Sequence, residues 1–439
     1  MNQHAQTRYN AHKIRSLATV VVLTLLATAC SAQSGTPSAL PFQGDDVAQE
    51  IVLTVWAWEG TGHELLIDAF ERENPGVRVE LVFSEFVQHH DGLTEALNAG
   101  VSVPDVAVIE REYAPRFQAH PEQFVDLSQF GAAELADSYL PWRWADGISD
   151  EAVIGIPTDV GGFSFAYRTD LFAEADLPAD PDEVAELFET WDSFIETGER
   201  YVDARGQGTF LDSVDSVYAG VANQLEAGYV DAEGEPALDG TGARAPWDLS
   251  IRAIESGIVG PHQQFTPEWN QAIVTGDFAV IAAPSWMGTH LAATAPDTEG
   301  LWAIAPAPGV GGNWGGSQLT IPAGAAHPEL AWELIDHLTN ADAQIELFRR
   351  NGNFPSMPEV FNLPEIVELE DPFFTNQTVG QIYVDSLQDV PIRITAPEER
   401  EIRTVYLDAL RLVLSDDLSA GGAWQVSRLE ALALLEQER

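Results

Sequence analysis

The sequence predicts an α/β protein with a mainly parallel sheet flanked by helices. Short apolar runs at 53–58, 77–83 and 105–109 alternate with stretches of helical periodicity. This order of strand, helix, strand, helix and strand is typical of parallel sheets that are covered by helices on both faces. The 439 residues are enough for two lobes with cores of their own, and an apolar content of 45% excludes disorder for most of the chain.

The first predicted helix has a start signal and an apolar face. Thr61 stands three residues before Glu64, which is the spacing of a capping box. Four apolar residues then fall on one helical face: Leu65, Leu66, Ala69 and Phe70. A second helix is expected at 92–99.

The rest of the chain continues the alternation of strands and helices less regularly. We expect extended segments at 153–157 and 162–168, a helix-rich and strand-poor region over 170–276, strands at 278–283, 302–305 and 317–321, a helix at 328–339, and mostly helices in the last hundred residues. A turn is expected at Gly161-Gly162, where the second of these extended segments begins.

The first thirty residues predict a secretion signal of the lipoprotein type. They hold Arg8, Lys13 and Arg15 but no acidic residue, and an apolar run follows that is too short to span a bilayer comfortably. Cys30, the only cysteine, stands where such a signal is cleaved. We therefore expect lipidation at Cys30, with simple cleavage or a retained anchor as the alternatives.

Residues 31–50 are small and polar and include proline, so they predict a flexible tether. Because Cys30 is assigned to the anchor, the folded part has no thiol, which excludes disulfides and cysteine metal sites.

The charge excludes a nucleic-acid-binding protein. There are 69 acidic against 21 basic residues, a net charge of −48, which becomes −51 without the three bases of the signal. Binding to nucleic acid needs clustered Lys and Arg. The acidic surface also repels anionic membrane lipids, so we expect membrane attachment to depend on the lipid anchor at Cys30. The acidity serves either solubility or adaptation to high salt.

The glycines at 60–65 imitate a dinucleotide-binding loop, but two features argue against one. Leu65 stands where the third glycine of that motif allows close packing around a pyrophosphate. Glu59 lies directly before the turn, where its charge opposes a phosphate.

The same strand ends predict a site for a neutral, hydroxyl-rich ligand. Open α/β sheets bind ligands beyond the carboxyl ends of their strands. Trp58 ends the first predicted strand and Glu59 follows it, and Glu110 and Tyr113 follow the third. An aromatic ring covers the apolar face of a sugar, and a carboxylate accepts hydrogen bonds from its hydroxyls. Trp56 lies two residues deeper in its strand, and we expect it in the core.

Segments distributed from Leu53 to Ser356 carry a family resemblance. They read, in order, LTVWAW, AFERENPGVRVELV, GLTEALNAGVSVPDVAVIE, VDLSQF, IGIPTDVGGFSFAYRTDLFAEADLP, TWDSF, VTGDFAVIAAPSW, WAIAPAPGVGGNWGGSQLTIPAG, AWELIDHLTNADAQIELF and GNFPS. By their order and spacing the chain resembles the family 1 extracellular solute-binding proteins of ABC importers, the group that contains maltose-binding protein.

The resemblance implies two α/β lobes with mixed sheets, joined by crossing strands that form a hinge. The implied division is 1–30 signal, 31–50 tether, 51–157 plus 280–338 for one lobe, and 158–279 plus 339–439 for the other. It also implies a monomer outside the cytoplasm, anchored to the membrane by lipid, that closes over a mono- or oligosaccharide and delivers it to permease subunits. No cofactor, metal or nucleic acid is implied.

Nine positions match ligand contacts of the family: Trp58, Glu59, Glu110, Asp159, Trp286, Trp314, Gly315, Gly316 and Phe354. The resemblance implies that the tryptophans stack on sugar rings and that the three acids accept hydroxyl hydrogen bonds. The two glycines, which have no Cβ, would let backbone groups approach the ligand.

Three alternatives remain. A carbohydrate-active enzyme could use a pair such as Glu59 and Glu110, although acids are common enough here to pair by chance, and the chain has no GxSxG motif. A metal site at His89-His90-Asp91 is disfavoured, because neighbouring side chains on a helix point apart and such a pair is more often on the surface. A tethered sugar sensor without transport cannot be separated from an importer component by sequence.

The ligand is expected to be uncharged. The protein is strongly acidic, and no Arg cluster marks the predicted cleft, where Arg111 and Arg116 are the nearest by sequence.

Overall fold

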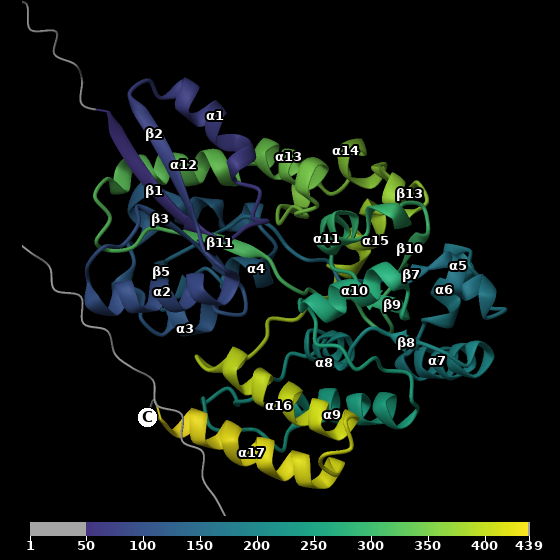
Figure 1. The fold of residues 1–439 in the computed structure, drawn as a ribbon. Coiled ribbons are helices and arrows are strands. Elements are labelled where there is room, and N and C mark those ends of the chain that lie inside the picture. Colours follow the sequence, from purple (N-terminus) through teal and green to yellow (C-terminus); the bar gives the residue numbers. More distant parts are fainter. Residues whose placement is uncertain (1–49, 438–439) are drawn as a thin grey trace, which may run out of the picture. The chain divides into compact units, whose positions relative to one another are not determined.

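Two separate β-sheets organise residues 50–437, the part of the chain that the computed structural model describes (Figure 1). Cys30, the predicted signal and most of the predicted tether lie outside it. The five-stranded sheet has the order β2 (Val77–Phe83), β1 (Ile51–Ala57), β3 (Val106–Glu110), β11 (Ser317–Thr320) and β6 (Ile156–Pro157). The four-stranded sheet has the order β10 (Trp302–Pro306), β7 (Ser164–Arg168), β9 (Phe278–Ala282) and β8 (Thr209–Leu211). Two short ladders pair β4 (Ile148–Ser149) with β5 (Ala152–Val153) and β12 (Glu370–Asp371) with β13 (Gln377–Thr378).

Both large sheets are mixed. β1 runs parallel to β2 and β3, as the strand–helix alternation predicts, but β11 is antiparallel to both β3 and β6. In the other sheet β7 is antiparallel to β9 and β10, and only β8 and β9 are parallel. The expectation of a mainly parallel sheet is therefore correct for β2-β1-β3 and wrong for the strands that enter from elsewhere in the chain.

Helices cover both sheets, and we call each sheet with its helices a lobe. The first lobe contains α1 (Glu64–Glu73), α2 (Phe86–Ala99), α3 (Ala114–Gln118), α4 (Pro141–Ala145), α12 (Pro328–Thr339), α13 (Ala341–Asn351) and 3₁₀ turns at Pro121–Gln123, Leu127–Phe130 and Ala132–Ser138. The second contains α5 (Thr169–Glu174), α6 (Pro181–Leu187), α7 (Trp191–Arg205), α8 (Val214–Ala222), α9 (Thr241–Glu255), α10 (Pro267–Thr275), α11 (Met287–Thr294), α14 (Pro364–Val367), α15 (Gly380–Ser386), α16 (Glu399–Leu414), α17 (Ala420–Gln437) and 3₁₀ turns at Pro296–Thr298, Pro358–Val360 and Pro372–Phe374. None of the helices within 50–437 is long and apolar enough to cross a membrane.

Each lobe has apolar cores of its own. In the first, Val55 of β1 packs with Phe70 of α1 and Leu334 of α12. In the second, the largest cluster joins β7 and β8 to the C-terminal helices and includes Tyr406 and Trp424. Most apolar side chains are thus buried against their own sheets. Another cluster joins Trp142 of α4 and Phe348 of α13 to residues of β9 and β10, so some apolar contacts also connect the lobes.

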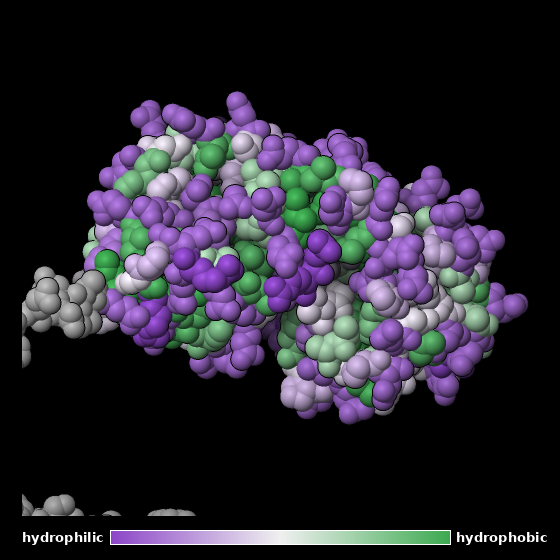
Figure 2. All heavy atoms as spheres, turned by 90° about the horizontal axis from the view of Figure 1, so that it is seen from above, coloured by the Kyte–Doolittle hydropathy of each residue, from purple (hydrophilic) through white to green (hydrophobic). Residues whose placement is uncertain are grey.

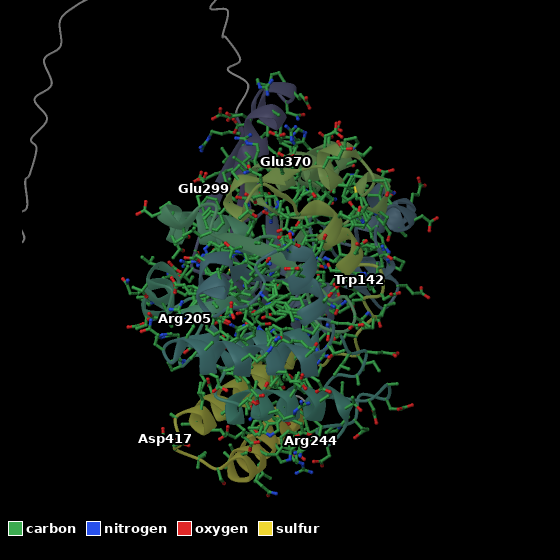
Figure 3. All side chains as sticks on the ribbon, turned by 90° about the vertical axis from the view of Figure 1, so that its right-hand side faces the viewer. Trp142, Arg205, Arg244, Glu299, Glu370 and Asp417 are labelled. Atoms are coloured by element: carbon green, nitrogen blue, oxygen red, sulfur yellow. The ribbon has the colours of Figure 1, made fainter. Side chains whose placement is uncertain are left out.

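Hydrophilic residues cover most of the face seen in Figure 2, as the charge predicts. Figure 3 shows charged side chains on the outside of the second lobe, among them Arg244 in α9 and Asp417 after α16. An exposed, acidic surface of this kind favours solubility.

The membership of the sheets differs from the division expected from the sequence. β9 and β10 belong to the second sheet, where Val280 pairs with Tyr167 and with Leu211. The chain was expected to re-enter the first lobe at residue 280, but it re-enters the first sheet only at β11. α13 also stays with the first lobe, since Leu347 is part of its core. The apolar residues of β9 and β10 would suit either sheet. For this reason the sequence does not show that these two strands belong to the second sheet.

The capping box predicted at Thr61 is wrong. The residue at the N-cap of α1 is His63, and no side chain caps the helix. Gly60 and Gly62, with φ angles of 97° and 77°, turn the chain so that Thr61 lies before the cap, and its Oγ1 has no hydrogen-bond partner among the described residues. The predicted apolar face is rotated slightly, because the buried positions are Leu66, Ile67 and Phe70.

Candidate functional site

Several sequence-predicted residues meet at one edge of the first sheet. Because β11 is antiparallel to its neighbours, its first residue Ser317 pairs with Glu110, the last residue of β3, and Gln318 pairs with Pro157 at the end of β6. β1 ends at the same edge as β3, since the two strands are parallel. Trp58, Glu110 and Asp159, which follow or end these strands, therefore lie at this edge.

Three segments cross between the lobes at this edge, around 158–163, 307–316 and 352–356. They pair in extended conformation: the Val160 N–H donates to the Phe354 carbonyl at 2.8 Å, and the Trp314 N–H donates to the Gly161 carbonyl at 2.8 Å. The predicted turn at Gly161-Gly162 is wrong, because these residues lie within the extended crossing segment, where Gly162 forms an isolated bridge with Asn313. A Cβ on Gly161 would stand 1.9 Å from the Trp314 carbonyl oxygen, so the pairing requires a glycine there.

The end of β9 brings Trp286 from the second sheet to the crossing segments. Its indole Nε1 donates to the Trp314 carbonyl at 3.0 Å, and the neighbouring Ser285 hydroxyl donates to the Val160 carbonyl at 3.2 Å. The carboxyl ends of β1 and β3 in one lobe and of β9 in the other thus border the same crossing region, where an open α/β protein binds its ligand.

Asp159 braces the crossing segments in this conformation. Its Oδ1 accepts from the Thr158 hydroxyl at 2.6 Å and the Ser317 N–H at 2.8 Å, and its Oδ2 accepts from Asn353 Nδ2 at 3.1 Å. Arg143 donates to the Asp159 and Ser317 carbonyls from a fully buried position. The ligand contact expected of Asp159 stays a prediction, and both of its carboxylate oxygens already have protein donors.

Gly315 and Gly316 were expected to let backbone groups approach the ligand, and the structure shows a close approach of another kind. Gly315 and Gly316 have φ angles of 98° and 105°. A Cβ on Gly315 would stand 2.9 Å from Trp286 Nε1, and one on Gly316 would stand 2.6 Å from the Asp159 carbonyl oxygen. What approaches these glycines closely in this structure is therefore the protein itself, and their contact with a ligand stays a prediction.

Trp314 and Phe354 are placed in cores. Trp314 is buried beside Phe163, with ring centroids 6.2 Å apart, and Phe354 is fully buried against Phe348 at 4.9 Å. Their roles as ligand contacts stay predictions, and their packing favours a part in holding the crossing segments.

Trp58 and Trp286 keep part of their indole surface accessible. Trp58 packs on one side against Phe86, His89 and His90, with ring centroids 5.1 to 5.4 Å away. Other tryptophans, such as Trp302, are fully buried. Half-buried indoles that follow strands of the two sheets, one of them bonded to a crossing segment, are suited to stacking on a ring of a ligand. Glu59, next to Trp58, is exposed.

Glu110 is buried, and its carboxyl group is shifted toward the protonated form. Burial raises its pKa to about 8, and the negative charge of Glu112 adds to the shift, while the Glu112 N–H, Arg403 and Arg111 oppose it. Oε2 accepts from the Glu112 N–H at 2.6 Å. A protonated carboxyl group can donate one hydrogen bond and accept others, so at neutral pH Glu110 can match either side of a hydroxyl.

Replacing Glu110 by Gln should change how stability depends on pH. The folded pKa of about 8 lies above the ordinary 4.5, so the folded state holds this proton more tightly and the contribution of Glu110 to wild-type stability falls as pH rises from 4.5 to 8. Burial lowers the pKa values of His63, His89 and His90, which gives the opposite slope below about pH 6.5. The quantity to measure is therefore the free energy of unfolding in urea, variant minus wild type. We expect this difference in unfolding free energy to increase with rising pH, by up to about 1.4 kcal/mol per pH unit, and to level off above pH 8.

Asp212 provides the matched control. Burial raises its pKa to about 6, so the difference for Asp212→Asn should level off near pH 6. A difference for Glu110→Gln that stays flat between pH 6 and pH 8 would show that Glu110 is ionised throughout.

The expectation that His89 and His90 lie on the surface is wrong. Both are buried. His90 Nδ1 lies 2.8 Å from the Phe86 carbonyl, and its Nε2 accepts the Glu110 N–H at 3.1 Å, while His89 Nε2 lies 2.7 Å from the Val108 carbonyl. These imidazoles serve the backbone, and the described ranges contain no group of three or more His, Cys, Asp or Glu side chains that could hold a metal ion.

Sequence reasoning missed the arginines that α16 brings to the site. Arg403 pairs with Glu112, and Arg400 lies over the Tyr113 ring with Cζ 4.7 Å from its centroid. The expectation that no Arg cluster lies near the cleft is therefore wrong, although Arg403 is already paired with an acid. About 290 residues separate the partners, and no local pattern could have joined them.

Two cavities lie outside the predicted contacts. One, of about 190 Å³, is bordered by Ser285, Gly352 and Tyr383 among others. The other, of about 320 Å³, lies between Leu140, Phe361 and Leu387. None of the nine predicted contacts lines either cavity.

Comparison with known proteins agrees with the geometry. A family model described as bacterial extracellular solute-binding protein matches residues 66–375. A crystal structure described as an extracellular solute-binding protein family 1 is 31% identical, with a TM-score of 0.81 and coverage of 88% of this chain and 100% of that one. The resemblance and the two-lobe fold predicted from the sequence are thereby confirmed.

Two more distant relatives are named for sugars. The arabinooligosaccharide-binding protein of Halalkalibacterium halodurans is 24% identical over 371 residues, which cover 79% of this chain and 81% of that protein. An ABC transporter associated binding protein from B. animalis subsp. lactis Bl-04, solved with beta-1,6-galactobiose, is 19% identical with a TM-score of 0.74 and coverage of 88% and 98%.

The matched family consists of binding proteins that act outside the cytoplasm. This confirms the prediction of an extracytoplasmic binding protein over that of a carbohydrate-active enzyme. By the match over most of its length, the chain belongs to the family of bacterial extracellular solute-binding proteins.

Proposed function

We propose that this protein captures a neutral oligosaccharide between its lobes and delivers it to the permease subunits of an ABC importer. The observation that carries the proposal is the pair of half-buried indoles, Trp58 and Trp286, at the ends of the two sheets beside the crossing segments. The protonated Glu110 lies at the same edge and suits a hydroxyl. The names of the relatives that bind arabino-oligosaccharide and galactobiose support an oligosaccharide over other solutes.

A thermal-shift screen of the purified full chain tests this proposal. The panel contains neutral arabino-, galacto- and malto-oligosaccharides, uronic-acid oligosaccharides and sugar phosphates. A ligand that binds only the folded state adds about 2.7 kcal/mol of stability at a concentration of 100 times Kd, so a true ligand raises Tm clearly. We expect a neutral oligosaccharide to do so and to be recovered unchanged. A shift with sugar phosphates alone would contradict the proposed cleft chemistry, and turnover of the sugar would indicate an enzyme.

Transport and sensing are separated by uptake. Deletion of the gene should abolish import of the sugar that the screen identifies. Normal uptake in the deletion strain, together with loss of a response to that sugar, would favour a tethered sensor.

We also propose that the protein is a monomer attached to the membrane through lipid on Cys30. The basic start, the short apolar run and the position of this single cysteine support the anchor. Wild-type protein should incorporate labelled fatty acid and fractionate with membranes, and Cys30→Ser should do neither. Membrane-bound protein after that substitution would point to an uncleaved apolar segment instead.

A further inference from the structure

The first turns of α16 make charged contacts with the opposite lobe. The helix belongs to the second lobe, since Ile402, Tyr406 and Leu410 are fully buried in its main core. Its N-terminal end lies beside α3 of the first lobe (Figure 1). There, Arg403 pairs with Glu112 and Glu401 pairs with Arg116.

These contacts are partly shielded from solvent. Side-chain exposure is 22% for Arg403 and 17% for Glu112, and 24% and 32% for Arg116 and Glu401. A single exposed ion pair contributes little to stability. Here two partly desolvated pairs lie close together, one with its acid on α16 and the other with its base on α16, and charges grouped in this way contribute more. A cation–π contact adds to them, because the Arg400 guanidinium lies over the ring of Tyr113, which is itself buried.

The contacts lie directly behind two predicted ligand residues. The Glu112 N–H donates to Glu110 Oε2 at 2.6 Å. Tyr113 stacks on His90 with ring centroids 3.7 Å apart and planes within 2°, and His90 in turn packs against Trp58 at 5.1 Å. When α16 contacts the first lobe, it therefore supports the segment and the ring that hold Glu110 and Trp58 in place.

We propose that the N-terminal end of α16 is an electrostatic latch, formed by Arg400, Glu401 and Arg403, that holds the two lobes together and raises the affinity of the cleft for its solute. Contacts that exist only when the lobes are together shift the population toward the closed form, and a binding site that is already closed costs less to occupy. The part of this inference that concerns affinity rests on the proposed function, whereas the part that concerns closure does not.

Distances between the lobes test the latch without any ligand. In the full chain carrying Cys30→Ser, dyes are attached to cysteines that replace Glu95 of α2 and Glu255 of α9, both of which are exposed. Arg403→Glu places two acids opposite each other and should lower the energy transfer between the dyes. Adding Glu112→Arg should restore it, since the pair is then reversed rather than broken. Arg428→Glu, which breaks a pair with Asp239 inside the second lobe, is the control and should leave the distance unchanged.

Affinity is measured on the same proteins with arabinotriose as the probe. We expect Arg403→Glu to weaken binding about tenfold and the double variant to recover it. If Arg403→Glu does not fold, Arg403→Gln replaces it in both measurements, because the Gln variant removes the charge without creating repulsion. An unchanged distance in both Arg403 variants, or a charge reversal that does not restore it, overturns the latch. Failure of arabinotriose to bind any of the proteins counts against the proposed ligand class, and the distances still decide the latch.

Discussion

Replacing Arg143 by Met is expected to lower the free energy of unfolding by about 3–5 kcal/mol. The side chain is fully buried and donates to the carbonyls of Asp159 and Ser317 and to Asp146 Oδ2, the last at 3.0 Å. Met fills a similar volume but donates nothing, so buried acceptors lose their partner. A loss of this size is a large part of the 5–15 kcal/mol that is typical of folded proteins. Urea unfolding followed by tryptophan fluorescence measures it.

Arg252→Met is the matched control. Its ion pair with Asp192 at 2.7 Å is exposed, at 53% and 72% for the two side chains, and exposed pairs contribute little to stability. Similar losses for the two variants would mean that the bonds of Arg143 to the crossing segments have no special importance.

Replacing Trp286 or Trp58 by Ala is expected to weaken binding of the captured oligosaccharide by about 30- to 100-fold each, or roughly 2–3 kcal/mol. Each indole is half-buried at the end of a strand, and stacking on a sugar would complete its burial. Isothermal titration with the best ligand from the thermal-shift screen measures the effect.

Trp332→Ala separates binding from stability. Trp332 of α12 is also half-buried, and it stacks on Phe130 with ring centroids 6.0 Å apart, within the first lobe. Its replacement should lower Tm but leave affinity unchanged. If the three variants lose affinity equally, the two indoles of the cleft have no direct role.

Local signals in the sequence predicted much of the fold. The alternating run at Val77–Phe83 and the periodic stretch at Pro328–Thr339 are a strand and a helix with those bounds. The apolar stretches at β1, β3, β7, β9 and β10 are also strands within a few residues. Sheet membership was harder, because it depends on which lobe a strand enters and not on the strand's own residues. The helix start at Thr61 failed because two glycines with positive φ move the cap to His63.

The site was predictable where it follows strand ends and not where it depends on tertiary contacts. Trp58 and Glu110 could be placed, because parallel strands end at one edge of a sheet. The bracing bonds of Asp159 depend on Ser317 and Asn353, both more than 150 residues away. The raised pKa of Glu110 and the arginines of α16 likewise arise only when distant segments pack together.

A crystal structure of the protein with the oligosaccharide that gives the largest thermal shift tests the central claim most directly. We expect the sugar in the cleft between the lobes, with its rings on the indoles of Trp58 and Trp286 and a hydroxyl bonded to Glu110. A sugar that binds elsewhere on the protein, with both indoles and Glu110 out of contact with it, would contradict the account.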